Sequence, residues 1–113
     1  MKLILPDSLP MKFTPRVEYA LSVYAMKIRL TKSLAALMGT AQNKLAFHVD
    51  ENYLKITINP EGFAVDSNIS DHYIKSRQLC GEILRAFNAV GRLKFHVSKE
   101  EEGVFICKAI VIQ

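Results

Sequence analysis

The amino-acid sequence predicts an α+β domain, because runs of alternating apolar residues and two stretches of helical spacing occur in the same chain. The chain has 113 residues, of which 50% are hydrophobic and 23% charged, a composition typical of a globular protein. A chain of this length buries only about two-thirds of the surface that its unfolded form exposes. We therefore expect residues 1–113 to form a single domain that gains stability from a second copy.

The first part of the chain is expected to change from an irregular arm to β-strands. Three prolines fall within residues 1–16 and disfavour both helix and central strand, so this segment is expected to form an arm. From Val17 to Leu30, apolar and polar residues alternate, which predicts strands with a break near Ala25. Helical spacing of residues 17–26 is an alternative that this stretch leaves open.

A short helix and a β-hairpin are predicted next. Thr31 is a suitable N-cap, and Gly39 a suitable C-terminal stop, for a helix over residues 32–38. Residues 45–49 and 54–58 then alternate with period two on either side of a polar turn. This pattern predicts a β-hairpin.

The remaining residues are predicted to add a longer helix and a second hairpin. Apolar residues at spacings of three and four predict a helix from a cap at Ser70 or Asp71 to Ala89. Residues 93–97 alternate, and a charged turn separates them from the apolar run 104–112. We expect two strands here, and we expect both faces of the second strand to be covered.

Residues 17–60 resemble the AbrB-type (SpoVT-AbrB, MazE-like) DNA-binding module in their order of strand, short helix and hairpin. In that family an aliphatic residue ends the strand, a lysine opens the helix, and the helix ends in Leu-Gly. Leu30, Lys32, Leu34 and Met38-Gly39 keep the family's spacing. The hairpin that follows stands where the last two strands of the family stand.

The resemblance implies a swapped-hairpin dimer, in which two chains interleave their strands into one small barrel. Residues 61–113 would extend the core of that dimer with a helix and two strands. The resemblance also implies a homodimeric transcriptional regulator that binds double-stranded DNA. The chain departs from the family at Thr31, where the family has proline, and at Ala35 and Ala36, where the family often has charged residues.

The positive charge of the chain suggests which residues would contact DNA. The formal net charge is +4, and it arises within residues 1–58, where eight basic residues accompany four acidic ones. Lys27 and Arg29 share one strand face, about 7 Å apart at about 3.3 Å per residue, and would be the central contacts. Arg16 and Lys32 would support them, and binding through such contacts to phosphates is sensitive to salt. The alternative is that these four residues simply form the solvated face of a half-buried sheet.

The sequence does not predict an enzyme. His48, His72 and His96 are far apart and match no spacing of metal ligands. Cys80 and Cys107 lie in apolar runs and are expected to be buried free thiols, as in a reducing compartment. We expect no catalytic residue, metal or cofactor, and we place the protein in the cytoplasm. The apolar run at the N-terminus is too short for a signal peptide, and no stretch approaches the length of a membrane span.

A protein–protein interaction module is the alternative function. An antitoxin or an assembly platform of phage or mobile-element origin would use a flexible arm to hold a protein partner. The proline-containing arm and the near-neutral second half of the chain suit this role. A continuous basic face would favour nucleic acid, whereas an exposed apolar groove would favour a protein partner.

Overall fold

The computed structural model describes residues 18–69 and 71–110, so the whole of the predicted arm, with Arg16, lies outside the described residues. The described chain forms one eight-stranded antiparallel sheet with the strand order β3-β4-β8-β7-β1-β2-β6-β5. This result confirms the α+β class. The elements in chain order are β1 (Ala20–Val23), β2 (Lys27–Leu30), α1 (Lys32–Met38), β3 (Leu45–Val49), β4 (Leu54–Ile58), β5 (Asp66–Ser67), β6 (His72–Lys75), α2 (Arg77–Ala86), β7 (Leu93–Glu101) and β8 (Val104–Ala109).

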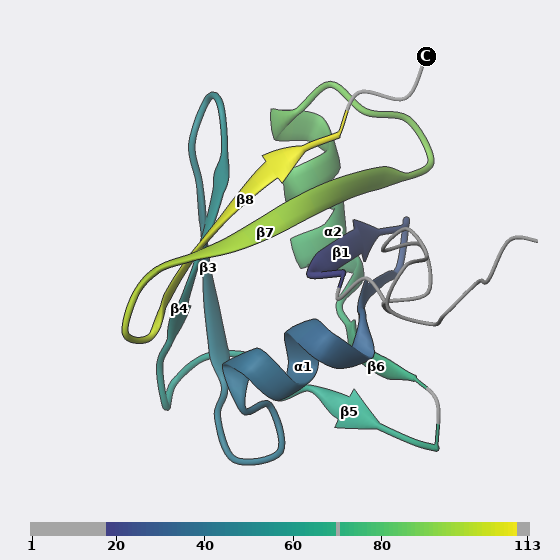
Figure 1. The fold of residues 1–113 in the computed structure, drawn as a ribbon. Coiled ribbons are helices and arrows are strands. Elements are labelled where there is room, and N and C mark those ends of the chain that lie inside the picture. The colour runs from purple at the N-terminus through teal and green to yellow at the C-terminus, as the bar shows by residue number, and fades with distance from the viewer. Residues whose placement is uncertain (1–17, 70, 111–113) are drawn as a thin grey trace, which may run out of the picture.

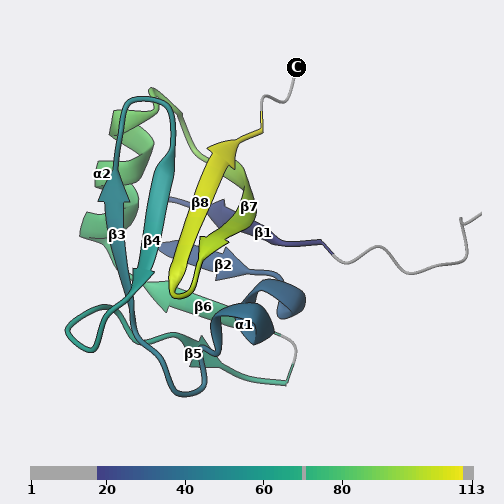
Figure 2. The same ribbon diagram turned by 60° about the vertical axis from the view of Figure 1, so that its left-hand side comes forward.

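The sheet curls into a half-barrel (Figure 1). In Figure 2, β3, β4, β8 and β7 stand side by side, while β1, β2, β6 and β5 run across them. Both helices bury side chains in the core on the inner side of this curve. Within the described residues, neither helix has the length and apolar character needed to span a membrane.

The N-terminal hairpin and the short helix follow the sequence prediction. β1 pairs with β2, and the Tyr24 N–H donates to the Lys27 carbonyl at 2.8 Å, so the break lies around Ala25 as expected. The helical alternative for this stretch is wrong across the described residues, since they form a strand. Helix α1 begins after Thr31, whose side chain accepts from the Leu34 N–H, and ends at Gly39 with a left-handed φ of 65°.

The predicted hairpin of β3 and β4 is confirmed, and β3 forms one edge of the sheet. The chain then turns back, and the backbone groups of Phe63 bond to those of Leu45 at 2.7 and 2.9 Å. Gly62 permits this approach, because a Cβ atom at that position would lie 2.3 Å from the Leu45 carbonyl oxygen. A glycine is required there by the close contact of two backbones.

The prediction of a helix from residue 71 to residue 89 is wrong at both ends. Residues 72–75 form β6, which pairs with β2, and Ser76 caps α2 instead of Ser70 or Asp71. The end of the helix also comes early, because Asn88 adopts a left-handed φ of 52°. Residues 72–75 form a strand and not the start of the helix, because β2 would otherwise leave its backbone groups unpaired at the edge of the sheet.

The C-terminal hairpin joins the two earlier hairpins into one sheet. β7 pairs with β1 and β8 pairs with β4, so the hairpin lies between the two halves of the sheet. The predicted charged turn over residues 99–103 is too long, since β7 continues to Glu101 through a register shift. On β8, Phe105 and Cys107 are fully buried while Val104 and Ile106 are half-buried. We expected both faces of this strand to be covered, but one face is covered only in part.

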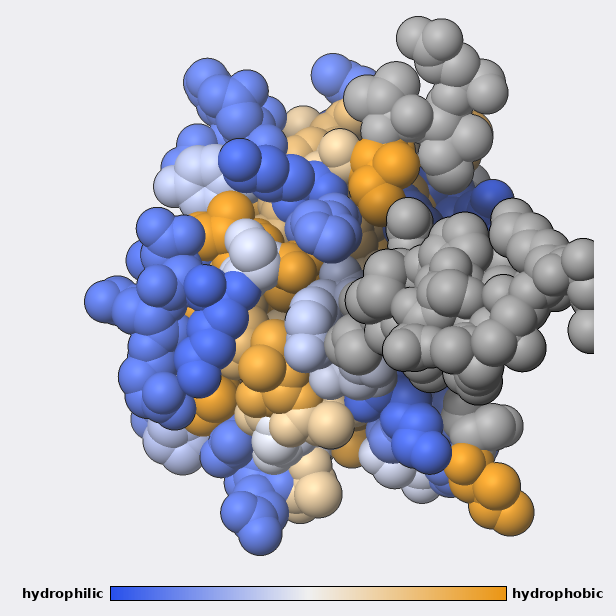
Figure 3. All heavy atoms as spheres, viewed as in Figure 1, coloured by the Kyte–Doolittle hydropathy of each residue, from blue (hydrophilic) through white to orange (hydrophobic). Residues whose placement is uncertain are grey.

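One apolar core fills the inner side of the curve. It takes alternate residues from the strands and the apolar faces of both helices, so α2 is amphipathic as predicted even though it is shorter. The largest fully buried side chains are Phe95, Phe105, Leu21, Ile28, Leu34, Met38, Leu45, Leu54, Ile56, Ile83, Val23 and Val97. In the view of Figure 3, hydrophilic side chains gather at the β7–β8 turn, and apolar side chains show between this hairpin and α1.

Candidate binding surface

The outer face of the sheet carries a group of positively charged side chains. Because successive residues of a strand point to opposite faces, burial of Ile28, Ile74 and Phe95 turns their neighbours outward. Register places Lys27 opposite Lys75, and Arg29 lies opposite Ser22, which in turn lies opposite Lys94. We call this area the cationic surface, and its basic residues are Lys75 on β6, Lys27 and Arg29 on β2, Lys94 on β7 and Lys108 on β8.

Asp71 holds the two residues that sequence reasoning placed at the centre of the site. Lys27 Nζ lies 3.1 Å from Asp71 Oδ2, and Arg29 Nε lies 3.0 Å from Asp71 Oδ1. The hydrogen bond from Lys27, followed by that from Arg29, lowers the pKa of the Asp71 carboxyl, and the carboxylate raises the pKa of Arg29. The Asp71 side chain is only 18% exposed, whereas that of Arg29 is 50% exposed. The carboxylate therefore fixes both cations while Arg29 stays accessible.

Lys27 and Lys75 form a like-charge pair directly across two strands. Such a pair is unfavourable when the residues have no other partners. Their ammonium groups lie 4.3 and 5.6 Å from the ring centroid of Tyr73, so the negative face of the ring offsets part of the repulsion. Among the described residues, no carboxylate forms an ion pair with Lys75 or Lys108. Within the described residues, the cationic surface therefore keeps positive charge without an acidic partner at Lys75 on β6 and at Lys108 on β8.

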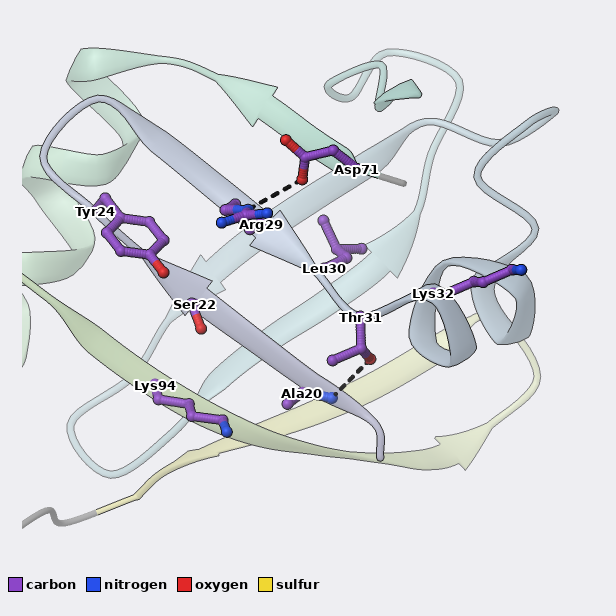
Figure 4. A pocket seen from close by; sticks show the side chains of 9 residues that line it. All are labelled: Ala20, Ser22, Tyr24, Arg29, Leu30, Thr31, Lys32, Asp71 and Lys94. Carbon is purple, nitrogen blue, oxygen red and sulfur yellow. Dashed lines mark hydrogen bonds and ion pairs between the residues drawn. The ribbon is translucent and has the colours of Figure 1, made fainter. Parts of the chain in front are cut away.

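A shallow cavity of about 270 Å³ lies in the middle of the cationic surface (Figure 4). Arg29 and Lys94 stand on either side of Ser22, two strand spacings or roughly 10 Å apart. Lys94 pairs with Glu18 at 2.8 Å, and this hydrogen bond is the main cause of a lowered pKa at Glu18. The full lining is Ala20, Ser22, Tyr24, Arg29, Leu30, Thr31, Lys32, Asp71 and Lys94.

The structure brings three of the four predicted site residues together. Lys27 and Arg29 share the outer face of β2, and Lys32 lines the cavity from the start of α1. Arg16 lies outside the described residues. Sequence reasoning missed Lys75 and Lys94, which reach the surface through strand pairings that are distant along the chain.

Other reactive residues lie apart from this surface. Cys80 and Cys107 are buried free thiols, as predicted. Burial raises the pKa of Cys107 to about 12, so this thiol stays protonated at neutral pH. Among the described residues, no three histidine, cysteine or acidic side chains are placed to hold a metal ion.

The arrangement is suited to binding an anion with several negative charges. It presents separated cations, hydroxyl groups from Ser22 and Tyr24, and a carboxylate that holds Lys27 and Arg29 in position. Comparisons with protein-family models, curated proteins and solved structures found no match.

Proposed function

We propose that the protein binds DNA through the phosphate groups that contact its cationic surface. The observation that carries the proposal is the like-charge pair of Lys27 and Lys75. Of the two opposed lysines only Lys27 has a carboxylate partner, Asp71, among the described residues, so a bound polyanion would supply the missing negative charge beside Lys75. Arg29 and Lys94 extend the positive area across β1, and Lys108 extends it to β8.

The carboxylates that accompany these cations do not cancel the positive charge of the surface. Asp71 is shared by Lys27 and Arg29, so this group of three side chains keeps a net positive charge. Asp66 on β5 stands opposite Tyr73 and ends the cationic surface on that side. A surface that is positive in the middle and acidic at its edge favours a ligand that lies across β2, β1 and β7.

The proposed role is transcriptional control by a homodimer, as the AbrB-type resemblance of residues 17–60 implies. A swapped-hairpin dimer would exchange strand pairings that β7 and β8 make within one chain here. A second copy has another place to bind at edge strand β3. The backbone groups of Leu45 bond to Phe63 on the side away from β4, so by alternation those of Phe47 and Val49 face the same side. No described strand pairs with them there.

The same edge favours a protein–protein interaction module as the second candidate function. An extended segment of another protein can add to a free strand edge through backbone hydrogen bonds. Val49 and Phe63 are exposed apolar residues beside this edge, and Phe63 packs edge-on against Phe47. Light scattering distinguishes self-association from a monomer. A Val49→Pro variant removes an N–H that points away from β4, and it does so without breaking the β3–β4 pairing.

Fluorescence anisotropy with labelled DNA of random sequence, as single strand and as duplex, tests the proposed function from low to physiological salt. We expect salt-sensitive binding that weakens in a Lys27→Gln/Lys75→Gln variant. The slope of log K against log salt should fall by about 1.5 to 2, the contribution of two phosphate contacts. The variant should lose little stability, because the change removes the repulsion between the two lysines together with the partly exposed ion pair of Lys27 with Asp71.

An Arg77→Gln/Arg85→Gln variant is the matched control. It removes the same charge from the exposed side of α2, which lies against the inner face of the sheet. Equal losses of affinity in both double variants would indicate a general charge effect and contradict a defined surface. No binding of either DNA form at low salt would contradict the function itself.

A further inference from the structure

We infer that the ligand of the cationic surface is single-stranded DNA, with the ring of Tyr24 as the surface on which a base stacks. The inference rests on the proposed DNA binding and specifies the form of DNA, and it replaces the duplex binding that the AbrB-type resemblance implies. It is carried by the shape of the surface, by the position of Tyr24 and by the spacing of the cations around it.

The shape of the surface does not suit a duplex groove. Proteins that read base edges in the major groove of a duplex commonly insert a helix or a two-stranded ribbon there. Here both helices bury their apolar sides in the core on the inner side of the sheet. The cationic surface itself consists of strand residues, so it presents short rows of side chains instead of a projecting element. A flexible single strand can follow such a surface, whereas a stiff duplex touches it at few points.

Tyr24 offers an aromatic face beside the cations. It lies in the turn between β1 and β2 and lines the cavity with Arg29 and Lys94. Figure 4 places its half-buried side chain among the residues that line the cavity, beside Arg29 and Ser22. Tyr73 differs, because the ammonium groups of Lys27 and Lys75 already contact its ring. A base can therefore stack on Tyr24 without displacing a lysine.

The cations around Tyr24 are placed to hold the phosphates that flank such a base. Arg29 lies on one side of Ser22 and Lys94 on the other. Stacking on an aromatic ring tolerates any base, and cations along the backbone supply salt-sensitive affinity. Together these features describe a site for single strands with little sequence preference.

The test compares a 15-nucleotide oligothymidine with a duplex of the same length, using the full chain and anisotropy at several salt concentrations. We expect tighter binding of the single strand. A Tyr24→Leu variant should bind it about 5- to 100-fold more weakly with an unchanged salt slope, since a stacking contact is lost and no charge is removed. Tyr24→Phe should restore most of the affinity. Tyr53→Leu, which changes another half-buried tyrosine in the β3–β4 turn, should have no effect.

Intrinsic fluorescence gives a second readout that does not need the leucine variant to fold. The chain has four tyrosines and no tryptophan, so its emission reports on tyrosine alone. Single-stranded DNA should quench part of this emission in the parent chain, and the duplex should quench less. Equal affinity for both forms, without quenching and without loss in the leucine variant, would overturn the inference and leave the proposed function standing. No binding of either form would overturn both.

Discussion

The inner and outer faces of the sheet differ sharply although the same strands build them. On β2 the inner face carries Ile28, which is fully buried, and the outer face carries Lys27 and Arg29. On β7 the buried Phe95 follows Lys94 directly in sequence. The inner face packs on two helices, whereas the outer face carries two directly opposed lysines, of which only Lys27 has a carboxylate partner among the described residues. Stability and proposed function thus reside on alternate residues, so each can be changed separately.

The strongest test of this separation replaces two neighbouring residues of β7. Phe95→Ala empties a fully buried site and removes the edge-on contact with Phe87, whose ring centroid is 5.1 Å away. We expect a loss of about 3–5 kcal/mol in the free energy of unfolding. Lys94→Ala should cost less than about 1 kcal/mol, because its ion pair with Glu18 is largely exposed. Urea denaturation measures both, and similar losses would contradict the separation of the two faces.

The sequence predicted best those elements whose pattern is local. The β3–β4 hairpin and helix α1 depend on alternation, caps and turns within a few residues, and the structure has both at the expected positions. β6 was missed because its strand conformation depends on pairing with β2, which lies more than forty residues earlier. The apolar spacing of Leu79 and Ile83 was real, but it extended the predicted helix past the point where Ser76 begins it.

The same limit applies to the binding surface. Lys27 and Arg29 were predicted to share a face because two residues of one strand must do so. Lys75 and Lys94 alternate correctly within their own strands, yet the sequence does not state that β6 and β7 flank the β1–β2 hairpin. Asp71 was predicted only as one of two candidates for a helix cap, and its pairing with two cations could be seen only in the fold.

A smaller effect is expected at Thr31, where the two faces meet the start of α1. Its hydroxyl oxygen accepts from the N–H groups of Leu34 and Ala20, at 3.3 and 3.2 Å, and donates to the Glu18 carbonyl at 2.7 Å. Thr31→Ala should reduce the free energy of unfolding by about 1–2 kcal/mol, since it removes a helix cap and leaves backbone groups without a partner. Thr31→Ser keeps the hydroxyl and should lose much less in the same urea titration. Equal losses would mean that the methyl group, not the hydroxyl, is what stabilises this junction.

The smallest expected effect concerns the outer face of the sheet, and it is a gain in DNA affinity instead of a loss. Asp71→Asn removes the carboxylate that Lys27 and Arg29 share, so both become free to contact phosphate. We expect DNA affinity to rise a few-fold at low salt, with a salt slope steeper by about one contact. The pKa of Asp71 is lowered, so the parent carboxylate stays charged to a lower pH than an ordinary carboxyl and loses its stabilising effect only as the pH falls through that lowered value. The parent should therefore bind DNA through these residues equally at pH 5 and pH 7.

Glu82→Gln on the exposed side of α2 is the control of equal charge for Asp71→Asn. An unchanged affinity in Asp71→Asn beside an unchanged control would show that Lys27 and Arg29 serve the fold through Asp71 and do not meet the ligand.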